Sequence, residues 1–373
     1  MLLVASFVRP HPGGIEDFVD TARALLAERG VRSTVLACRL PGWDTTADVV
    51  VPTRFLGSSS WPLPVGGWRT LWREVSSADL VLANNTRQVL PVLAVLLARA
   101  RGRPAFLVMH GSGVGPYAGQ RASAFARAWF QRSLGRLAMR LGHPISVSRA
   151  GLEGARNLYG VEASYLPYPL RRQSPPARPT DLSPDEAMRV VWVGRLFPEK
   201  DPLRAVEAVE LLRRKRGAEL HVCGDGPLRR RLERLAGERR WLHLHGALSR
   251  QAAQDLQAGA HVCLSTSAAD NVQVAVLEAL SRGIPTVSTR VGDARSYYGA
   301  ASLRDLCVPA GDPAAIAAAL GEIASSYDSY RRRFSANAEI LRARHEHVGE
   351  ELVRLLCSGS AEGRGLERPA AVT

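Results

Sequence analysis

Short apolar segments alternate with longer amphipathic ones along most of this 373-residue chain, and this order constrains the fold more than any other feature. In the first half, the strand-like segments are 2–5, 32–37, 49–51, 79–83, 105–109, 145–148 and 164–166. Helix-like segments lie between them, at 15–29, 69–77, 87–101, 120–141 and 149–159. Such alternation predicts right-handed crossovers and a mainly parallel sheet.

The alternation stops at residues 171–187, which hold four prolines and show no apolar periodicity, so we interpret them as an interdomain linker. It then restarts with strand-like segments at 190–193, 219–223, 242–245, 261–264 and 286–289. The sequence therefore predicts an α/β protein with two Rossmann-like, doubly wound domains, 1–170 and 188–344, facing each other across a cleft. A C-terminal helix at 345–358 is expected to return to the first domain, and 359–373 are expected to be disordered.

Composition excludes several protein classes. An apolar fraction of 46% is too high for a disordered chain. The five cysteines form no C-x-x-C pair, which argues against a disulfide scaffold or a cysteine zinc site and favours a reducing compartment. No targeting or membrane-spanning segment is recognisable. We expect a cytoplasmic protein that at most rests peripherally on the inner face of a membrane.

The net charge of +14 is unevenly distributed. Residues 1–178 carry 22 arginines against 10 acidic residues, whereas the rest of the chain carries 27 basic and 25 acidic residues. Nearly all basic residues are arginine, and the only lysines are Lys200 and Lys215. Because a guanidinium cannot reproduce a compact ammonium, each lysine in such a chain is a candidate functional residue.

Ligands of doubly wound folds usually bind at the carboxyl ends of the strands, so the strand-to-helix loops of the second half are the first candidates. The loop 194–201 offers Arg195 and Lys200, a guanidinium and an ammonium that suit a diphosphate. The alternative is that both are solvated surface charges. The next loop, Gly224-Asp225-Gly226-Pro227, has the residues of a tight strand-to-helix turn.

A third loop, beginning at Ser265, runs into a helix whose first amides, near Val274 and Ala275, could receive phosphate. Asp270 lies just before this helix, and its alternative role is an N-cap. Glu278 lies two turns into the helix, and its alternative role is a solvent-facing carboxylate.

These motifs resemble, in order and spacing, the donor domain of GT-B glycosyltransferases, specifically retaining glycosyltransferase family 4. Gly194, Arg195 and Lys200 match its G-R-x-x-x-x-K, Gly224–Pro227 match its G-D-G-P turn, and Asp270 to Glu278 matches its E-x-x-x-x-x-x-x-E helix. The resemblance covers about 130 residues of the second half. The first half adds His11-Pro12-Gly13-Gly14 and Met109-His110-Gly111 at strand ends.

The resemblance implies a role for each matched residue. Arg195 and Lys200 would hold the donor diphosphate, with Gly14 and the amides of Val274 and Ala275. Glu278 would bind the ribose, and Asp270 the transferred sugar. Catalytic residues would be His110, Asp270, Arg195 and Lys200; a lone histidine at a strand end is otherwise more often structural. Gly13 and Gly14 would form the donor/acceptor loop, and Gly224, Gly226 and Pro227 the turn near the nucleotide.

The chain also departs from the family pattern. Asp270 replaces the customary glutamate, Asn271-Val272-Gln273 replace small or aromatic residues, and Leu166-Pro167-Tyr168-Pro169 replaces an I-P-N-G turn. These changes bear on donor identity more than on reaction class. The resemblance implies retention of anomeric configuration, a nucleotide-sugar co-substrate and no cofactor. Because the chain contains no Asp-x-Asp motif, no metal is expected at the diphosphate.

The basic excess of the first half includes a helix that mixes arginines with large apolar residues: Arg121, Phe125, Arg127, Trp129, Phe130, Arg132, Leu134, Arg136, Leu137, Arg140 and Leu141. This pattern suits an anionic membrane surface, and equally a domain helix with its apolar side in the core. The hydroxyl acceptor could then be lipid-linked or anionic. Rival functions are a sugar-nucleotide epimerase of the same fold, an inactive glycosyltransferase-like partner, and a nucleic-acid binder, for which no binding motif is present.

Overall fold

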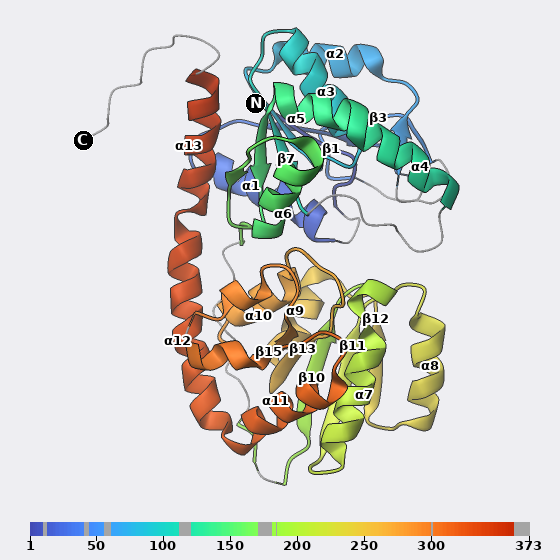
Figure 1. Cartoon of the computed structure of the whole chain (residues 1–373), viewed down its shortest axis with the longest axis vertical. Coiled ribbons are helices and arrows are strands. Elements are labelled where there is room, and N and C mark those ends of the chain that lie inside the picture. Colours follow the sequence, from blue (N-terminus) through green and yellow to red (C-terminus); the bar gives the residue numbers. More distant parts are fainter. Residues whose placement is uncertain are drawn as a thin grey trace, which may run out of the picture. The chain divides into compact units, whose positions relative to one another are not determined.

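The structure, a computed structural model, describes residues 1–9, 13–40, 45–55, 61–111, 121–170, 181–183, 185–299 and 301–361. The chain forms two compact units, one of residues 1–171 together with 347–373, the other of residues 172–346. Each unit is built on one parallel sheet with helices against it (Figure 1). The predicted α/β class is therefore confirmed. Residues 171–180 and 184 of the predicted linker lie outside the described residues.

The sheet of the first unit has the order β3-β2-β1-β6-β7-β8-β9, with neighbouring strands parallel. Its strands are β1 Leu2–Ala5, β2 Thr34–Cys38, β3 Val49–Val51, β6 Val81–Asn84, β7 Ala105–Met109, β8 His143–Ser146 and β9 Ser164–Tyr165. The central strands β1, β6 and β7 are buried along their whole length, as apolar strands covered on both faces should be. The order reverses between β1 and β6, so their carboxyl ends form the switch point where ligands bind in such sheets.

The helices of this unit are α1 Gly14–Ala27, α2 Trp68–Ser77, α3 Val89–Ala100, α4 Arg121–Phe130, α5 Arg136–Leu141, α6 Arg149–Gly154 and α13 Val348–Ala361. Helix α13 packs against α1, which assigns the C-terminal helix to the first unit. A small antiparallel hairpin, β4 Thr53–Phe55 with β5 Pro62–Pro64, was not predicted, because prolines in a short segment argue against a strand.

The sheet of the second unit has the order β12-β11-β10-β13-β14-β15, again parallel. Its strands are β10 Met188–Val193, β11 Ala218–Cys223, β12 Leu242–Gly246, β13 Val262–Ser265, β14 Thr286–Thr289 and β15 Cys307–Val308. Its helices are α7 Pro202–Arg213, α8 Arg229–Glu238, α9 Arg250–Ala258, α10 Val274–Ser281, α11 Pro313–Ser325 and α12 Tyr327–Glu346. The switch point lies between β10 and β13, next to the loops at 194–201 and 265–273.

Two boundaries differ from prediction for local reasons. The helix expected at 120–141 is interrupted by a π-helical turn, Gln131–Gly135, where the Ser133 hydroxyl donates to the carbonyl of Trp129 at 2.7 Å and so competes with the helical ladder. The expected disordered tail begins too early, because α13 continues to Ala361, and only 362–373 lie outside the described residues.

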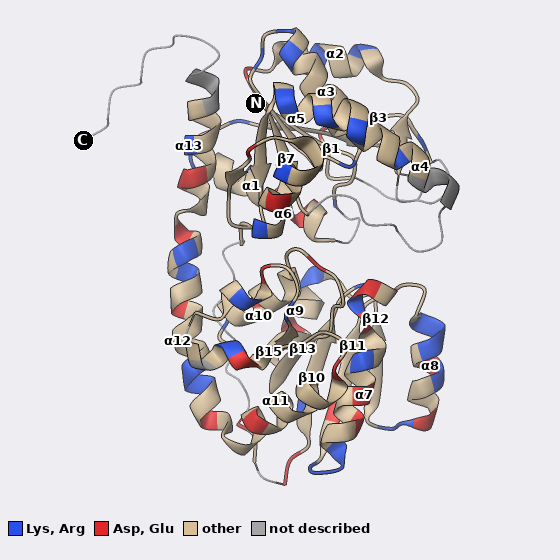
Figure 2. Cartoon of the chain, viewed as in Figure 1, with Lys and Arg blue, Asp and Glu red and all other residues tan. Residues whose placement is uncertain are grey.

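Basic residues recur along α2, α3, α4 and α5 of the first unit, whereas the second unit mixes both signs (Figure 2). Among the helices that the structure describes, none is both long and apolar enough to cross a membrane.

Candidate active site

The loop after β10 carries the two predicted diphosphate ligands on one short turn. Pro198 starts a 3-10 helix, Pro198–Lys200, and Asp201 follows in a left-handed conformation (φ 43°) before α7 begins. Lys200 is thus held at the last position of a rigid turn. Its side chain is one-fifth exposed, whereas that of Arg195 is half exposed.

Lys200 forms an ion pair with Asp270, which comes from the loop after β13. Both side chains are largely buried, so the pair is not a loose surface contact. Backbone contacts hold the two loops together: the amide of Ala268 donates to the carbonyl of Glu199 at 2.9 Å, and the Thr266 hydroxyl donates to the carbonyl of Asp201 at 2.7 Å. The structure therefore joins two motifs that lie 70 residues apart.

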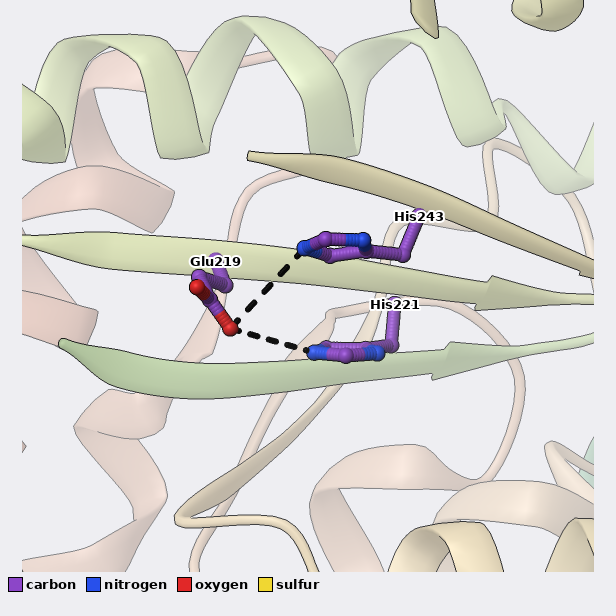
Figure 3. A group of neighbouring side chains, drawn as sticks. All are labelled: Glu219, His221 and His243. Carbon is purple, nitrogen blue, oxygen red and sulfur yellow. Dashed lines mark ion pairs between the residues drawn. The ribbon is translucent and has the colours of Figure 1, made fainter. Parts of the chain in front are cut away.

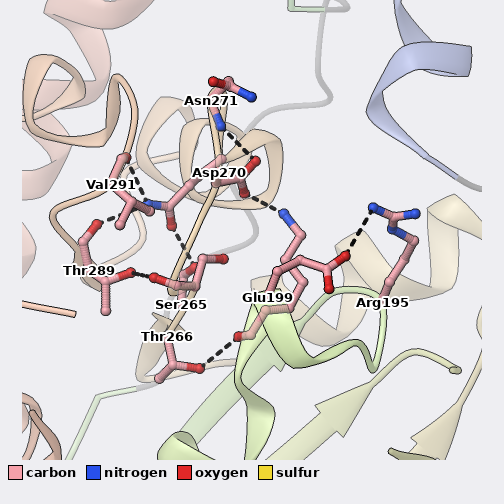
Figure 4. Close-up of polar contacts among 11 residues, drawn as sticks. Arg195, Glu199, Ser265, Thr266, Asp270, Asn271, Thr289 and Val291 are labelled. Carbon is pink, nitrogen blue, oxygen red and sulfur yellow. Dashed lines mark hydrogen bonds and ion pairs between the residues drawn. The ribbon is translucent and has the colours of Figure 1, made fainter. Parts of the chain in front are cut away.

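Arg195 contacts Glu199 instead, at 3.9 Å between Nη2 and Oε1, and its guanidinium lies 5.1 Å from the centre of the Phe197 ring (Figure 4). Because this pair is long and exposed, it costs Arg195 little to exchange Glu199 for an anionic ligand. Lys200 and Arg195 are therefore differently prepared, one anchored and one available.

The Asp270 carboxylate is not the N-cap of α10, so that alternative is wrong. The N-cap position is occupied by Gln273, which makes no side-chain capping bond. Asp270 bonds instead to Lys200 and, through Oδ1, to the amide of Asn271 at 3.0 Å (Figure 4). The first residues of α10, Val274 and Ala275, follow directly, so the loop delivers helix amides and Asp270 to the same neighbourhood.

Gln273, which sequence reasoning did not select, fixes this loop. Its amide nitrogen donates to the carbonyls of Thr289 at 2.9 Å and Val291 at 3.3 Å, and its oxygen accepts from the Ser265 hydroxyl at 2.6 Å. Gln273 is buried. The departure from the family pattern at 271–273 therefore supplies a clamp between β13 and the end of β14.

Glu278, the predicted ribose ligand, forms an ion pair with Arg250, the first residue of α9. Its exposure is 9%, so the solvent-facing alternative is wrong. Arg250 was missed because no spacing rule connects 250 with 278. The pair leaves Glu278 ionised and oriented, as a hydrogen-bond acceptor for hydroxyl groups must be.

The turn at Gly224–Pro227 packs backbone to backbone against the Arg195 loop. The amide of Leu196 donates to the carbonyl of Asp225 at 2.8 Å, and the amide of Leu228 donates to the carbonyl of Leu196 at 3.0 Å. A Cβ on Gly224 (φ 149°) would lie 1.8 Å from the carbonyl oxygen of Gly194. Beside this contact is a cavity of about 200 Å³ lined by Leu196, Val222, Gly224, Arg229, Glu233, Leu244 and Gly246.

The predicted residues of the first unit gather at the ends of β6 and β7 and the start of α1. His110 Nε2 bonds to Asn84 Oδ1, and its ring lies edge-on to Phe18 at 5.1 Å. Gly13 precedes α1, and the Gly14 carbonyl accepts from the hydroxyl of Tyr168. Asn84 and Tyr168 were not predicted, although Tyr168 belongs to the segment that departs from the family turn. His11 and Pro12 lie outside the described residues.

Burial lowers the pKa of His110 to about 3, so the folded protein keeps this imidazole neutral while the unfolded chain protonates it below about pH 6.5. The unfolded state therefore binds the extra proton, and stability should fall as the pH drops from 6.5 toward 3, by at most about 1.4 kcal/mol per pH unit. Urea unfolding should show a weaker acid dependence for His110→Gln than for the wild type. Identical pH dependence in the two proteins would contradict this expectation.

Comparison with known proteins agrees with this geometry. Residues 12–166 match the family model of Glycosyltransferase Family 4, and residues 187–326 match that of Glycosyl transferases group 1. The chain is 29% identical to 2-deoxystreptamine N-acetyl-D-glucosaminyltransferase from Streptomyces fradiae over 372 residues, covering 89% of this chain and 87% of the relative. Over 31% of its length, it is also 34% identical to a quarter of the human phosphatidylinositol N-acetylglucosaminyltransferase polypeptide.

Two solved structures share the fold. The Anabaena protein HepE in complex with UDP-glucose superposes with a TM-score of 0.70 at 15% identity, covering 96% of this chain and 99% of that one. Sucrose-phosphate synthase from Thermosynechococcus elongatus gives a TM-score of 0.71 at 17% identity, covering 97% and 99%. With its two halves matched by glycosyltransferase models and its fold shared with these enzymes, the chain is a glycosyltransferase of the GT-B fold.

Proposed function

We propose that this enzyme transfers a sugar from a nucleoside diphosphate sugar to a hydroxyl acceptor with retention of anomeric configuration. The observation that carries the proposal is the Lys200–Asp270 ion pair, which sets a buried ammonium beside a carboxylate at the start of α10. An ammonium at this position can take charge from a departing diphosphate, and the carboxylate can hold sugar hydroxyls.

Catalysis in this proposal is mainly electrostatic. Arg195, Lys200 and the first amides of α10 stabilise the diphosphate as its charge develops. Glu278, held by Arg250, accepts hydrogen bonds from the ribose hydroxyls. The leaving phosphate helps to deprotonate the acceptor on the face from which it departs, which gives retention without a covalent intermediate. His110, neutral over the working pH range, positions the sugar rather than exchanging protons.

For the donor we propose UDP-N-acetylglucosamine. The names of two relatives, from Streptomyces fradiae and human, specify N-acetylglucosaminyl transfer, and a structural neighbour was solved with UDP-glucose. The acceptor in the Streptomyces fradiae relative's name is 2-deoxystreptamine, a polyhydroxylated amine, and we propose a hydroxyl of such a compact acceptor as the first to test.

The test is a thermal-shift screen of the full chain against UDP, GDP, ADP and dTDP sugars, followed by product analysis. A ligand at 100 times its dissociation constant stabilises the folded state by about 2.7 kcal/mol, enough to detect. We expect UDP-N-acetylglucosamine to give the largest shift and the product to show a retained anomeric centre by NMR. An inverted product would overturn retention, an epimer formed from donor alone would identify an epimerase, and donor binding without turnover would indicate an inactive partner.

We further propose that α4 and α5 rest on an anionic membrane when the acceptor is lipid-linked. Phe125 (79% exposed) and Trp129 (61%) project from α4, and Leu137 is exposed on α5. Phe130, by contrast, is buried, and Arg127 lies over the Trp61 ring, so part of the predicted pattern belongs to the core.

Vesicle co-sedimentation tests this contact. We expect binding to phosphatidylglycerol vesicles to fall at least several-fold in Phe125→Ser/Trp129→Ser, because both large apolar side chains lose their burial in the interface. Equal sedimentation of wild type and variant, or no preference for anionic over neutral vesicles, would remove the membrane from the proposal.

A further inference from the structure

Four polar side chains line up on one face of the neighbouring strands β11 and β12, at the edge of the second unit's sheet. Glu219 and His221 alternate along β11, and His243 and His245 alternate along β12. His221 and His243 are direct partners in the parallel register, so both lie on the same face. Strand β12 is the edge strand, which leaves this face partly open.

The side chains converge on one point (Figure 3). The carboxylate Oε2 of Glu219 lies 3.5 Å from Nε2 of His221 and 3.9 Å from Nε2 of His243. One ligand atom from each of the three residues falls within 4.8 Å of the others. Tetrahedral ligands at metal distances of about 2.1 Å are separated by about 3.4 Å, so only a small contraction is needed. The imidazole rings, now stacked at 4.6 Å and 23°, would turn toward each other.

The hydrogen bonding of His221 leaves its converging nitrogen free. Nδ1 of His221 lies 3.0 Å from Nε2 of His245, a bond that forms when Nδ1 carries the proton. This tautomer places a lone pair on Nε2 of His221, facing Glu219. Nε2 of His221 and Nε2 of His243 are both buried atoms with no hydrogen-bond partner among the described residues. A ligating histidine whose other nitrogen is bonded to a neighbour is the usual arrangement at metal sites.

Burial lowers the pKa of His221, and the neighbouring His243 and His245 lower it further. Burial also lowers the pKa of His245, with His243 adding to the effect. Glu219 opposes the shift at His221 only partly. These imidazoles are therefore neutral near pH 7, the state that offers lone pairs to a metal.

We propose that Glu219, His221 and His243 bind a divalent transition-metal ion of the Zn²⁺ class, with His245 orienting His221. Two imidazoles and one carboxylate are ligands that Zn²⁺ accepts, whereas Mg²⁺ prefers oxygen alone. The Glu219 and His243 side chains are 43% and 39% exposed, so water can complete the coordination. The ion would tie the edge strand β12 to β11. This proposal does not rest on the proposed reaction.

The test uses the full chain, treated with chelator and dialysed, and measures bound metal per chain after addition of Zn²⁺ or Mg²⁺. We expect one Zn²⁺ per chain, no Mg²⁺, and a rise in melting temperature with Zn²⁺. His243→Gln and His221→Gln should each abolish stoichiometric binding. His245→Gln should bind one Zn²⁺ about 10- to 100-fold more weakly, because it removes only the orienting partner.

The matched control is His347→Gln, since His347 is an exposed histidine at 3.3 Å from Glu350 on α13 and tests casual His–Glu binding. It should bind Zn²⁺ like the wild type. No stoichiometric Zn²⁺ in the wild type, or binding that survives both His221→Gln and His243→Gln, would overturn the proposal. His243 lies on the edge strand, so its variant remains informative even if His221→Gln folds poorly.

Discussion

Replacing Lys200 by alanine should abolish sugar transfer while the protein stays folded. Removing one preorganised charge donor costs roughly 10²- to 10³-fold in rate, and Lys200 is the anchored donor of this site. The substitution also leaves the Asp270 carboxylate without its cation, which should weaken binding of the sugar as well. The measurement is turnover with saturating nucleotide sugar, alongside a circular dichroism spectrum.

The chain contains its own matched control, because Lys215 is its only other lysine and lies exposed after α7. Lys215→Ala should leave turnover unchanged. Lys200→Arg should recover little activity, since a planar guanidinium cannot occupy the place of the compact ammonium beside Asp270. Near-normal turnover by folded Lys200→Ala would contradict the site assignment.

The fold was largely predictable because buried parallel strands leave strong local signals. Apolar runs such as Leu2–Ala5 and Ala105–Met109 are strands at the predicted residues. What failed depends on competition that a linear pattern does not record. A serine hydroxyl takes a carbonyl from the helical ladder at Ser133, and Pro62–Pro64 pairs as a strand because Thr53–Phe55 lies opposite.

The site was predictable only where residues belong to one motif. Arg195 and Lys200 share a loop, and the structure gives Lys200 the partner Asp270, which separate motifs had suggested without linking them. Arg250 and Asn84 were missed, because each reaches its partner through the tertiary fold.

The cluster at Glu219 escaped for a different reason. The expectation of no metal rested on cysteine spacing and on the missing Asp-x-Asp motif. Alternating Glu-x-His and His-x-His segments become a possible ligand set only when their strands are known to be neighbours.

Gly224→Ala should be the most destabilising of these changes. The backbone of Gly224 has φ 149°, which L side chains rarely adopt, and an added Cβ would lie 1.8 Å from the carbonyl oxygen of Gly194. Since that atom is backbone, the Arg195 loop must move. We expect a loss of about 3 kcal/mol in the free energy of unfolding, together with weaker nucleotide binding.

The control is the same substitution at Gly237, which lies in α8 with no atom within 4 Å of its added Cβ. In a helix, alanine is favoured over glycine by about 1 kcal/mol, so Gly237→Ala should raise stability slightly and leave nucleotide binding unchanged. Opposite signs for one chemical change would attribute the effect at Gly224 to its contact with Gly194 and not to side-chain chemistry. Equal melting temperatures and nucleotide affinities for the two variants would show that the turn can yield, and that close backbone packing does not fix the Arg195 loop.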